Sequence, residues 1–321
     1  MKDCIGFGAL NVDLIYEVDD LADIIINGKP CEPGAEIFCA PQDFKRIKKV
    51  MDSQAVFKSQ SPGGSAANTI VALNRMGFST GYIGRLGQDE DGDFLLKSMH
   101  DTDTSRILRG GATGYTVVLI DKKRERTILV LPNANDELVF DDIDVEYGRL
   151  TKFLHLTSFA GEKPTQAQID LVKEIGKDVR VSFDPGEIHT QKGLTKMIPV
   201  IKHTDVLFVT DREARLLTGE DYVDGTRELL NYGPDIVVCK LGPEGSYLLS
   251  RDNEFHTPPA EVVPIDRTGA GDVFAAGFIA GMLKGYDLMR CARMATKAAA
   301  QSITGWGRTA YPDASLLTEG G

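Results

Sequence analysis

The chain has 321 residues, of which 36 are lysine or arginine and 47 are aspartate or glutamate, so its formal net charge is −11. With 42% hydrophobic, 26% charged and 7% aromatic residues, its composition is that of a folded globular protein and excludes a disordered, collagen-like or coiled-coil chain. The acidic balance disfavours binding to nucleic acids and to anionic membranes, because both carry negative charge.

The sequence predicts neither a membrane span nor an export signal. The longest uncharged apolar stretch, 273–283, is about half as long as a helix that crosses a bilayer. The first residues lack the basic region, the apolar core and the small-residue cleavage site of a signal peptide. The 5 cysteines are scattered and form no CxxC pair, which indicates reduced thiols and predicts a cytoplasmic protein.

The first predicted element is a buried strand at 4–10, with the sequence CIGFGAL. Asn11 and Asp13 follow this strand, and such polar groups suit a polyhydroxylated substrate. Asparagine and aspartate after a strand also form turns, so these residues alone do not decide the function. From 13 to 63 the chain shows no regular alternation of strands and helices, apart from a short helix predicted around 43–51. We interpret this stretch as an insertion.

The segment SPGGSAANTIVALNRMG, at 61–77, predicts a helix that begins directly after two glycines and ends at Gly77. Gly63 and Gly64 carry no side chain, so a ligand can approach the backbone closely. Asn68 lies one turn into the helix and offers both a hydrogen-bond donor and an acceptor. The segment therefore predicts a binding site at the start of a helix.

Residues 111–132 predict an antiparallel hairpin, in which GYTVVLI and TILVL are the strands and 121–126 is a charged turn. The hairpin and the insertion together predict a small β-rich lid, made of 14–62 and 111–132. Residues 1–13, 63–110 and 133–321 would form the α/β core of the same unit. An apolar face on such a lid often needs a cover, so a homodimer through the lid is a candidate assembly and a monomer is the alternative.

From residue 152 onward, short apolar runs alternate with longer amphipathic segments. The runs are KFLHL, VRVSF, DVLFV and DIVVCKL, which have the continuous apolar character of strands that are buried on both faces. The segments with helical length and spacing are 164–176, 211–218, 226–232, 271–284 and 288–303. This order predicts an α/β, doubly wound fold with a mostly parallel sheet and helices on both of its faces.

The segment IDRTGAGDVFAAGFIAGML, at 265–283, carries the clearest chemical signal. Gly269, Ala270 and Gly271 leave the backbone open at the start of a predicted helix, where unpaired N–H groups and the helix dipole favour an anion such as phosphate. Asp272 follows in the first turn, where we expect its carboxylate to be ionised near neutral pH. A base beside an anion site is what phosphoryl transfer to a hydroxyl requires.

The segments GGSAANTIVALNRMG and DRTGAGDVFAAGF resemble the two sequence patterns of the ribokinase family of ATP-dependent sugar and nucleoside kinases, also called the PfkB family. The resemblance covers nearly the whole chain, with further landmarks in GRLGQDEDG, DREARLLTG and KLGPEGSYLL. It implies a ribokinase-like fold and the transfer of the γ-phosphate of ATP, with Mg²⁺, to a hydroxymethyl group of a small sugar. The alternative acceptor is an adenosine-like nucleoside.

The resemblance also implies roles for individual residues. Asp272 corresponds to the general base, and the anion hole corresponds to Gly269, Ala270 and Gly271. Acceptor binding falls to Asn11, Asp13, Gly63, Gly64 and Asn68, and nucleotide binding to Lys240, Gly242, Gly245, Arg267 and Thr268. Glu213 corresponds to an acidic residue that helps to hold magnesium and phosphate through water. Thr210, where the family usually has asparagine, is a candidate for the same metal site.

Several positions depart from the family pattern or stay open. A monovalent cation is a further candidate cofactor, but Arg267 replaces a small residue that is common near that cation, so potassium dependence is not implied. Thr157 stands where ribokinases carry a sugar-binding glutamate, so ribose is not implied. Asp184, in FDPG, either forms a turn or reaches the phosphate region. Three arginines near the lid could contact a phosphorylated sugar, namely Arg109, Arg124 and Arg126. For Arg124 and Arg126, an exposed hairpin turn also explains the positive charge.

Other classes of protein fit the sequence less well. GFGALN resembles the dinucleotide-binding pattern GxGxxG but has Asn11 in the place of the third glycine. The chain has no GxxxxGK[ST], its GGSAA lacks the last glycine of a nucleophile elbow, and its 5 histidines have no metal-ligand spacing. A protein that keeps the kinase fold but only binds a sugar or a nucleotide remains an alternative, because a fold does not by itself imply catalysis.

Overall fold

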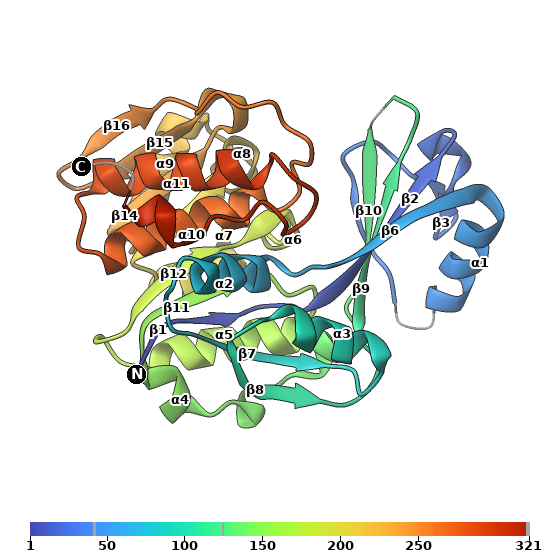
Figure 1. Ribbon diagram of the computed structural model, residues 1–321, viewed down its shortest axis with the longest axis horizontal. Coiled ribbons are helices and arrows are strands. Elements are labelled where there is room, and N and C mark those ends of the chain that lie inside the picture. The colour runs from blue at the N-terminus through green and yellow to red at the C-terminus, as the bar shows by residue number, and fades with distance from the viewer. Residues whose placement is uncertain (41–42, 124, 319–321) are drawn as a thin grey trace.

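The computed structural model describes residues 1–40, 43–123 and 125–318. Within these residues, a nine-stranded sheet forms the centre of the structure (Figure 1). From one edge to the other, its strands are β16 (Glu254–Thr257), β15 (Ser246–Ser250), β14 (Ile236–Lys240), β13 (Val206–Thr210), β12 (Arg180–Asp184), β11 (Thr151–Thr157), β1 (Lys2–Phe7), β7 (Thr80–Leu86) and β8 (Asp103–Arg109). The strands from β14 to β8 are parallel, and β15 and β16 form an antiparallel edge.

Helices cover both faces of this sheet, which confirms the predicted doubly wound fold. One face packs against α2 (Ser65–Arg75), α3 (Glu90–Ser98), α10 (Ala270–Leu283) and α11 (Leu288–Ser302). The other packs against α4 (Val145–Arg149), α5 (Glu162–Glu174), α7 (Leu194–Ile201), α8 (Asp211–Thr218) and α9 (Tyr222–Leu230). The shorter helices are α6 (Gly186–Thr190), η1 (Leu21–Asp23), η3 (Asn133–Glu137), η4 (Phe140–Asp142), η5 (Gly242–Glu244) and η6 (Ala314–Leu317).

Two boundaries differ from the predicted ones for clear reasons. The first strand ends at Phe7 instead of residue 10, because the chain leaves the large sheet there and enters a second sheet at Asn11. Helix α9 begins at Tyr222, four residues before the predicted start at 226. The side chain of Asp221 caps this helix by accepting hydrogen bonds from the N–H groups of Val223 and Asp224, at 2.9 and 3.1 Å.

The second sheet projects beside the core (Figure 1). Its described strands run in the order β5 (Glu36–Phe38), β10 (Arg126–Leu131), β9 (Gly114–Ile120), β2 (Asn11–Val18) and β6 (Ala55–Pro62), and we call it the small sheet. The predicted hairpin is present as β9 and β10, which pair antiparallel. The inserted segment also contains α1 (Phe44–Gln54) and a short pair, β3 (Ile25–Ile26) with β4 (Lys29–Pro30).

The two faces of the small sheet have different surroundings, because successive side chains of a strand point to opposite faces. Asp13 and Thr116 point toward the core, whereas Tyr16 and Val117 lie on the outer face. Helix α1 covers this outer face with buried apolar side chains such as Met51. The inserted segment thus covers the outer face of the small sheet.

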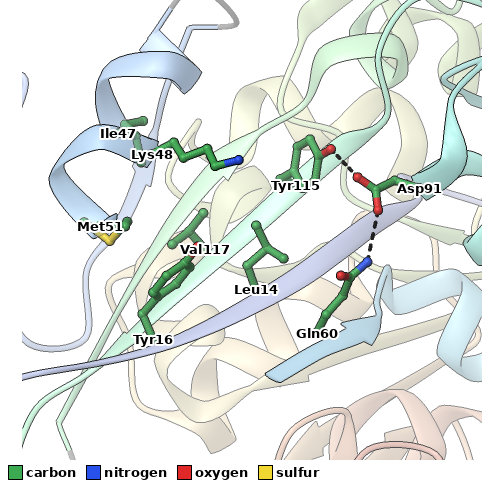
Figure 2. Close-up of a pocket in the computed structure, with 9 residues that line it drawn as sticks. All are labelled: Leu14, Tyr16, Ile47, Lys48, Met51, Gln60, Asp91, Tyr115 and Val117. Carbon is green, nitrogen blue, oxygen red and sulfur yellow. Dashed lines mark hydrogen bonds between the residues drawn. The ribbon is translucent and has the colours of Figure 1, made fainter. Parts of the chain in front are cut away.

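A hydrogen-bonded contact joins the outer face of the small sheet to the core. Asp91, in the first turn of α3, accepts hydrogen bonds from the hydroxyl of Tyr115 and from Nε2 of Gln60, the latter at 3.0 Å (Figure 2). These residues line one side of a cavity of about 200 Å³, and Lys48 of α1 lies on its other side (Figure 2). Asp91 therefore holds β6 and β9 against α3.

The lengths of the helices and the burial of the cysteines bear on membrane crossing and on thiol reactivity. Among the described residues, no helix has the length and the apolar composition that crossing a bilayer requires. All 5 cysteines fall within these residues, and each is a buried, free thiol. Burial raises the pKa of every one of these thiols, so they stay protonated and unreactive at neutral pH.

The contact of Asp91 with the small sheet predicts a local effect of Asp91→Ala. Loss of two hydrogen bonds, one of them to a half-buried hydroxyl, should lower the free energy of unfolding by about 1–3 kcal/mol. It should also speed amide hydrogen exchange in β6 and β9 more than in β1. Asp93→Ala is the matched control, because Asp93 forms only a partly exposed ion pair with Arg109. Equal effects of the two substitutions on exchange in β6 and β9 would contradict the assignment.

Candidate active site

A cavity opens where the parallel strands end. Strands β11, β12, β13 and β14 end at Thr157, Asp184, Thr210 and Lys240, and their parallel pairing brings these ends to one edge of the sheet. Ligands of open α/β sheets bind at such an edge. Here a cavity of about 380 Å³ lies between this edge, the start of α10 and the inner face of the small sheet.

The cavity brings together most of the residues that the sequence predicted for a site. Its lining includes Asn11, Asp13, Gly64, Asn68, Arg267, Thr268, Gly269, Ala270, Gly271 and Asp272. These residues come from segments far apart in the chain, namely β2, the start of α2 and the start of α10. The predicted residues outside the lining are Gly63, Thr210, Glu213, Lys240, Gly242 and Gly245.

Helix α10 starts at the wall of the cavity. Gly269 precedes it with a φ of 75°, a left-handed conformation that favours glycine. A Cβ atom on Gly271 would lie 3.4 Å from Nζ of Lys240, so the backbone at Gly271 is close to the ammonium group. The first N–H groups of a helix have no carbonyl partner within it. The structure therefore presents backbone donors, the positive end of a helix dipole and a nearby ammonium group together.

Asp272 stands in the first turn of α10, beside these donors. Its Oδ2 accepts a hydrogen bond of 2.8 Å from Nδ2 of Asn68, and its backbone carbonyl accepts one of 3.0 Å from the hydroxyl of Thr69. Burial raises the pKa of Asp272 to about 7, although the hydrogen bond from Asn68 favours the ionised form. The expectation of a fully ionised carboxylate is therefore wrong: burial outweighs the helix dipole, and both protonation states are populated near neutral pH.

Asp13 lies at the end of the cavity formed by the small sheet. Burial raises the pKa of Asp13 to about 7, against the effect of a hydrogen bond with Thr116. A Cβ atom on Gly63 would lie 2.3 Å from Oδ1 of Asp13, so only glycine fits beside this carboxyl group. Gly64 follows with a φ of 98° and lines the cavity itself. The glycine pair thus makes room for Asp13 and bends the chain into α2.

Two residues that the sequence analysis did not single out hold the predicted ones in place. Asn135, from η3, donates a hydrogen bond of 3.0 Å from Nδ2 to Oδ1 of Asn11 and pairs with both backbone groups of Leu10. Arg308, from the segment after α11, donates a hydrogen bond of 2.9 Å from Nε to Oδ1 of Asn68. Neither residue belongs to a recognisable motif, and both contacts join segments more than a hundred residues apart, so no local signal reveals them.

A buried charged cluster lies behind the start of α10. Lys240 donates a hydrogen bond to Asp184, and these side chains are only 12% and 8% exposed. Although burial opposes the charged form, the carboxylates of Asp184 and Glu213 raise the pKa of Lys240. Glu213 is itself buried, with a pKa that burial raises, so it is not a solvated surface charge. Within the described ranges, no group of three or more histidine, cysteine, aspartate or glutamate side chains is arranged to hold a metal ion.

Some predicted residues have clear structural roles at this edge. Thr210 and Glu213 form a capping box at the start of α8, in which each side chain accepts a hydrogen bond from the other residue's N–H group, at 3.2 and 2.9 Å. Gly242 and Gly245 form the turn after β14, with φ values of 58° and 89°. In that turn a Cβ atom on Gly245 would lie 2.0 Å from the carbonyl oxygen of Thr257, which requires glycine.

The arginines near the small sheet differ in their positions. Arg126 begins β10 and lines the cavity together with Glu36, so an exposed turn does not fully describe it. Arg109 instead donates hydrogen bonds of 2.8 Å to the carboxylate of Asp93 and to the carbonyl of Gly87, outside the cavity lining. Arg124 lies outside the described residues. Arg126 is therefore the arginine of this group that can face a ligand.

The chain matches a protein-family model and is similar to several known proteins. The model of the pfkB family of carbohydrate kinases matches residues 42–313. The chain is 36% identical over 243 residues to a sugar kinase of Archaeoglobus fulgidus that is described as uncharacterized. This alignment covers 74% of the present chain and 96% of the relative. The chain is also 32% identical over 274 residues to an ATP-dependent ribose-1-phosphate kinase of Halopiger xanaduensis. That alignment covers 83% of the present chain and 89% of the relative.

The fold has close counterparts among solved structures. The crystal structure of adenosine kinase from Sinorhizobium meliloti superposes with a TM-score of 0.86 at 21% identity, over 99% of this chain and 98% of that one. A ribokinase from Thermotoga maritima superposes with a TM-score of 0.79 at 22% identity, over 99% of this chain and 98% of that one. These likenesses show the fold alone, and they confirm the ribokinase-like architecture that the sequence predicts.

The buried cluster predicts a strong effect of Lys240→Met on stability. Without the ammonium group, the carboxylate of Asp184 stays buried and unpaired, so the free energy of unfolding near pH 7 should fall by about 3–5 kcal/mol. Urea denaturation near pH 7 measures this loss. Lys196→Met, which removes a partly exposed ion pair with Glu162, should cost at most about 1 kcal/mol, and equal losses would contradict the assignment.

Proposed function

Because the chain belongs to the pfkB family of carbohydrate kinases, we propose that it transfers the γ-phosphate of ATP to a hydroxymethyl group of a small sugar. The observation that carries this proposal is the position of Asp272, whose carboxyl group lies beside the open start of α10 and lines the same cavity as Asn11 and Asp13. A proton acceptor, an anion site and polar acceptor groups thus meet in one place. Phosphoryl transfer to an alcohol uses this combination.

Asp272 is the general base in this proposal. Asn68 occupies its Oδ2, and no described residue hydrogen-bonds its Oδ1, which leaves that oxygen for the proton of the attacking hydroxyl group. A pKa of about 7 suits this role, because a base with a pKa near the working pH is deprotonated often enough and still binds the proton strongly. The proton passes from the acceptor hydroxyl to Asp272 as the oxygen attacks the phosphorus.

The start of α10 and Lys240 are the proposed phosphate site. The backbone from Gly269 to Gly271 has no side chain larger than a methyl group, so phosphate oxygens can reach the N–H groups. Arg267 in the cavity lining and Lys240 behind Gly271 add positive charge near these N–H groups. These donors fit the γ-phosphate of ATP, whose negative charge is spread over its outer oxygens in the transition state.

Magnesium is proposed as the companion of ATP, because it neutralises phosphate charge when it is bound. Glu213, with Thr210 beside it, is the carboxylate that would face the metal through water. Both side chains already serve the cap of α8, so we expect indirect contact and not direct coordination. The resemblance also predicts that Gly242 and Gly245 bind the nucleotide, and it leaves a monovalent cation as a candidate cofactor.

The acceptor would lie between the inner face of the small sheet, which carries Asp13, and Asp272 at the start of α10. Asn11, Asp13 and Asn68 offer hydrogen bonds to sugar hydroxyl groups. A nucleoside is the alternative, and one observation favours it: β9, β10 and α6 add an apolar wall to the cavity, made of Val118, Ile128, Val130 and Ile188. Such a wall can cover a base. Movement of the small sheet toward the core would exclude water from the phosphoryl group in either case.

The assembly and the location of the protein stay predictions. Strand β6 is an edge strand of the small sheet, and Val56 and Phe57 on it are 60% and 53% exposed. A homodimer through the small sheet would use this edge, because an exposed edge strand with apolar side chains is a site of association. The cytoplasm would supply the ATP that the proposed reaction consumes.

A coupled assay of ADP release tests the function directly. The purified protein is given ATP and Mg²⁺ with pentoses, hexoses, their phosphates or nucleosides, one at a time. We expect acceptor-dependent ADP release with one class, whose identity distinguishes the sugar from the nucleoside proposal. Binding of these compounds without turnover, across the whole panel, would favour a protein that only binds its ligand.

Asp272→Asn tests the base. The amide cannot accept the proton, so kcat should fall by roughly a hundred- to a thousandfold, whereas ATP binding measured by calorimetry should stay near its normal strength. In the unsubstituted enzyme kcat should rise with pH through about 7 and then level off, because only the deprotonated carboxylate acts as a base. Asp170→Asn, at a carboxylate of α5 that is 33% exposed and lies outside the cavity lining, is the control. A near-normal kcat for Asp272→Asn would exclude the assignment.

A further inference from the structure

Arg308 reaches the proposed base through one intervening side chain. Its Nε donates a hydrogen bond of 2.9 Å to Oδ1 of Asn68, and Nδ2 of Asn68 donates one of 2.8 Å to Oδ2 of Asp272. These hydrogen bonds connect the segment after α11 with the first turns of α2 and α10. Arg308 itself does not line the cavity, so it makes no direct contact with a ligand there.

Other contacts hold the guanidinium group of Arg308 in this position. Its Nη1 donates hydrogen bonds to the carbonyl oxygen and the hydroxyl of Ser98, at 3.3 and 3.2 Å. The backbone carbonyl of Arg308 accepts a hydrogen bond of 2.8 Å from Nη1 of Arg75. Both the side chain and the backbone are thus anchored to the core, on α3 and α2. The third nitrogen, Nη2, is buried and has no hydrogen-bond partner among the described residues.

The chemistry of the three side chains fixes which groups donate and which accept in these two hydrogen bonds. A guanidinium group only donates hydrogen bonds, whereas a side-chain amide has one accepting end and one donating end. Arg308 can bind only the oxygen end of Asn68, and the NH₂ end must then face Asp272. A carboxylate is stabilised by a donor and destabilised by a facing carbonyl oxygen. Without Arg308, the amide of Asn68 is free to turn its oxygen toward Asp272.

We propose that Arg308 is a positioning residue for the phosphoryl transfer: it fixes the amide of Asn68 so that Asp272 is held as a proton acceptor with its Oδ1 free. The inference rests on the proposed function, because it assumes that Asp272 is the base. It assigns Arg308 no contact with substrate or nucleotide. The sequence gives no local sign of this role, since Arg308 lies 240 residues from Asn68.

Several charged and titratable groups surround Asp272, and the test must separate Arg308 from them. These groups are Asp13 from β2, Tyr82 from β7, Asp184 from β12, Lys240 from β14, and Arg308 and Tyr311 from the C-terminal segment. Arg308→Met removes a charge and the hold on Asn68 together. Arg308→Lys keeps the charge but cannot reproduce the planar set of donors that bridges Asn68 and Ser98.

The experiment measures kcat against pH for four proteins, which are the unsubstituted enzyme, Arg308→Met, Asn68→Ala and the double variant. Arg308→Met should lower kcat near neutral pH by roughly ten- to a hundredfold, with a smaller change in the KM for ATP. The rise of kcat should move to higher pH, so that part of the loss is recovered in alkaline buffer. The double variant should be no slower than Asn68→Ala alone, because Arg308 acts through Asn68. Arg308→Lys should restore kcat only in part.

A titration that needs no turnover separates the inference from the proposed function. Carbon-13 NMR of the side-chain carboxyl groups follows Asp272 in the ligand-free protein, with Asp272→Asn to assign its signal. The midpoint should lie higher in Arg308→Met than in the unsubstituted protein. If no acceptor supports turnover but the midpoint moves in this way, the proposed function fails, whereas the effect of Arg308 on Asp272 through Asn68 stands.

Controls exclude a general loss of structure. Arg149→Met removes an exposed arginine that also bonds a carboxylate and a backbone carbonyl, far from the cavity, and should leave the pH profile unchanged. Thermal unfolding and circular dichroism check that Arg308→Met and Arg308→Lys fold. An active Arg308→Met enzyme with an unshifted pH profile and an unshifted midpoint would overturn the inference. Losses that simply multiply in the double variant would overturn it as well.

Discussion

The start of α10 has to satisfy two opposing demands at once. Its backbone must be open to a phosphate group, whereas the carboxyl group of Asp272 must be buried enough to hold a proton near neutral pH. Left-handed backbone at Gly269 lets the helix begin directly at the cavity wall. Close packing then fixes the helix from behind, because a Cβ atom on Gly277 would lie 2.8 Å from the Cα atom of Ala295 in α11. The site depends on this backbone contact as much as on its polar groups.

The proposed reaction divides between the two sheets. The carboxyl edge of the large sheet provides Lys240 and the start of α10, which belong to the rigid core. The small sheet provides Asp13, which follows β1 so closely in the chain that it stays tied to the core. Asn135 reinforces this junction through Asn11 and Leu10. A ligand that touches both sheets would lie between the inner face of the small sheet and the proposed phosphate site at the start of α10, and this enclosure fits a kinase that must keep water from its phosphoryl group.

Sequence reasoning succeeded where the signal is local and failed where it depends on distant contacts. Helix α8 occupies the predicted 211–218, because its capping box lies within four consecutive residues. The residues around Gly269 were found because small residues before an apolar helix are visible in the sequence. The protonation of Asp272 was misjudged, since burial of its carboxyl group outweighs the local helix dipole. Asn135 and Arg308 were missed because each touches its partner across more than a hundred residues.

A crystal structure of the protein with ADP, Mg²⁺, aluminium fluoride and the acceptor found by the ADP-release assay would test the central assignment most directly. Aluminium fluoride mimics the phosphoryl group in transfer, so its position marks the reacting centre. The account predicts fluoride ligands within hydrogen-bond distance of the N–H groups at the start of α10 and an acceptor hydroxyl on Oδ1 of Asp272. A reacting centre away from α10, or an acceptor hydroxyl that faces another base, would contradict it.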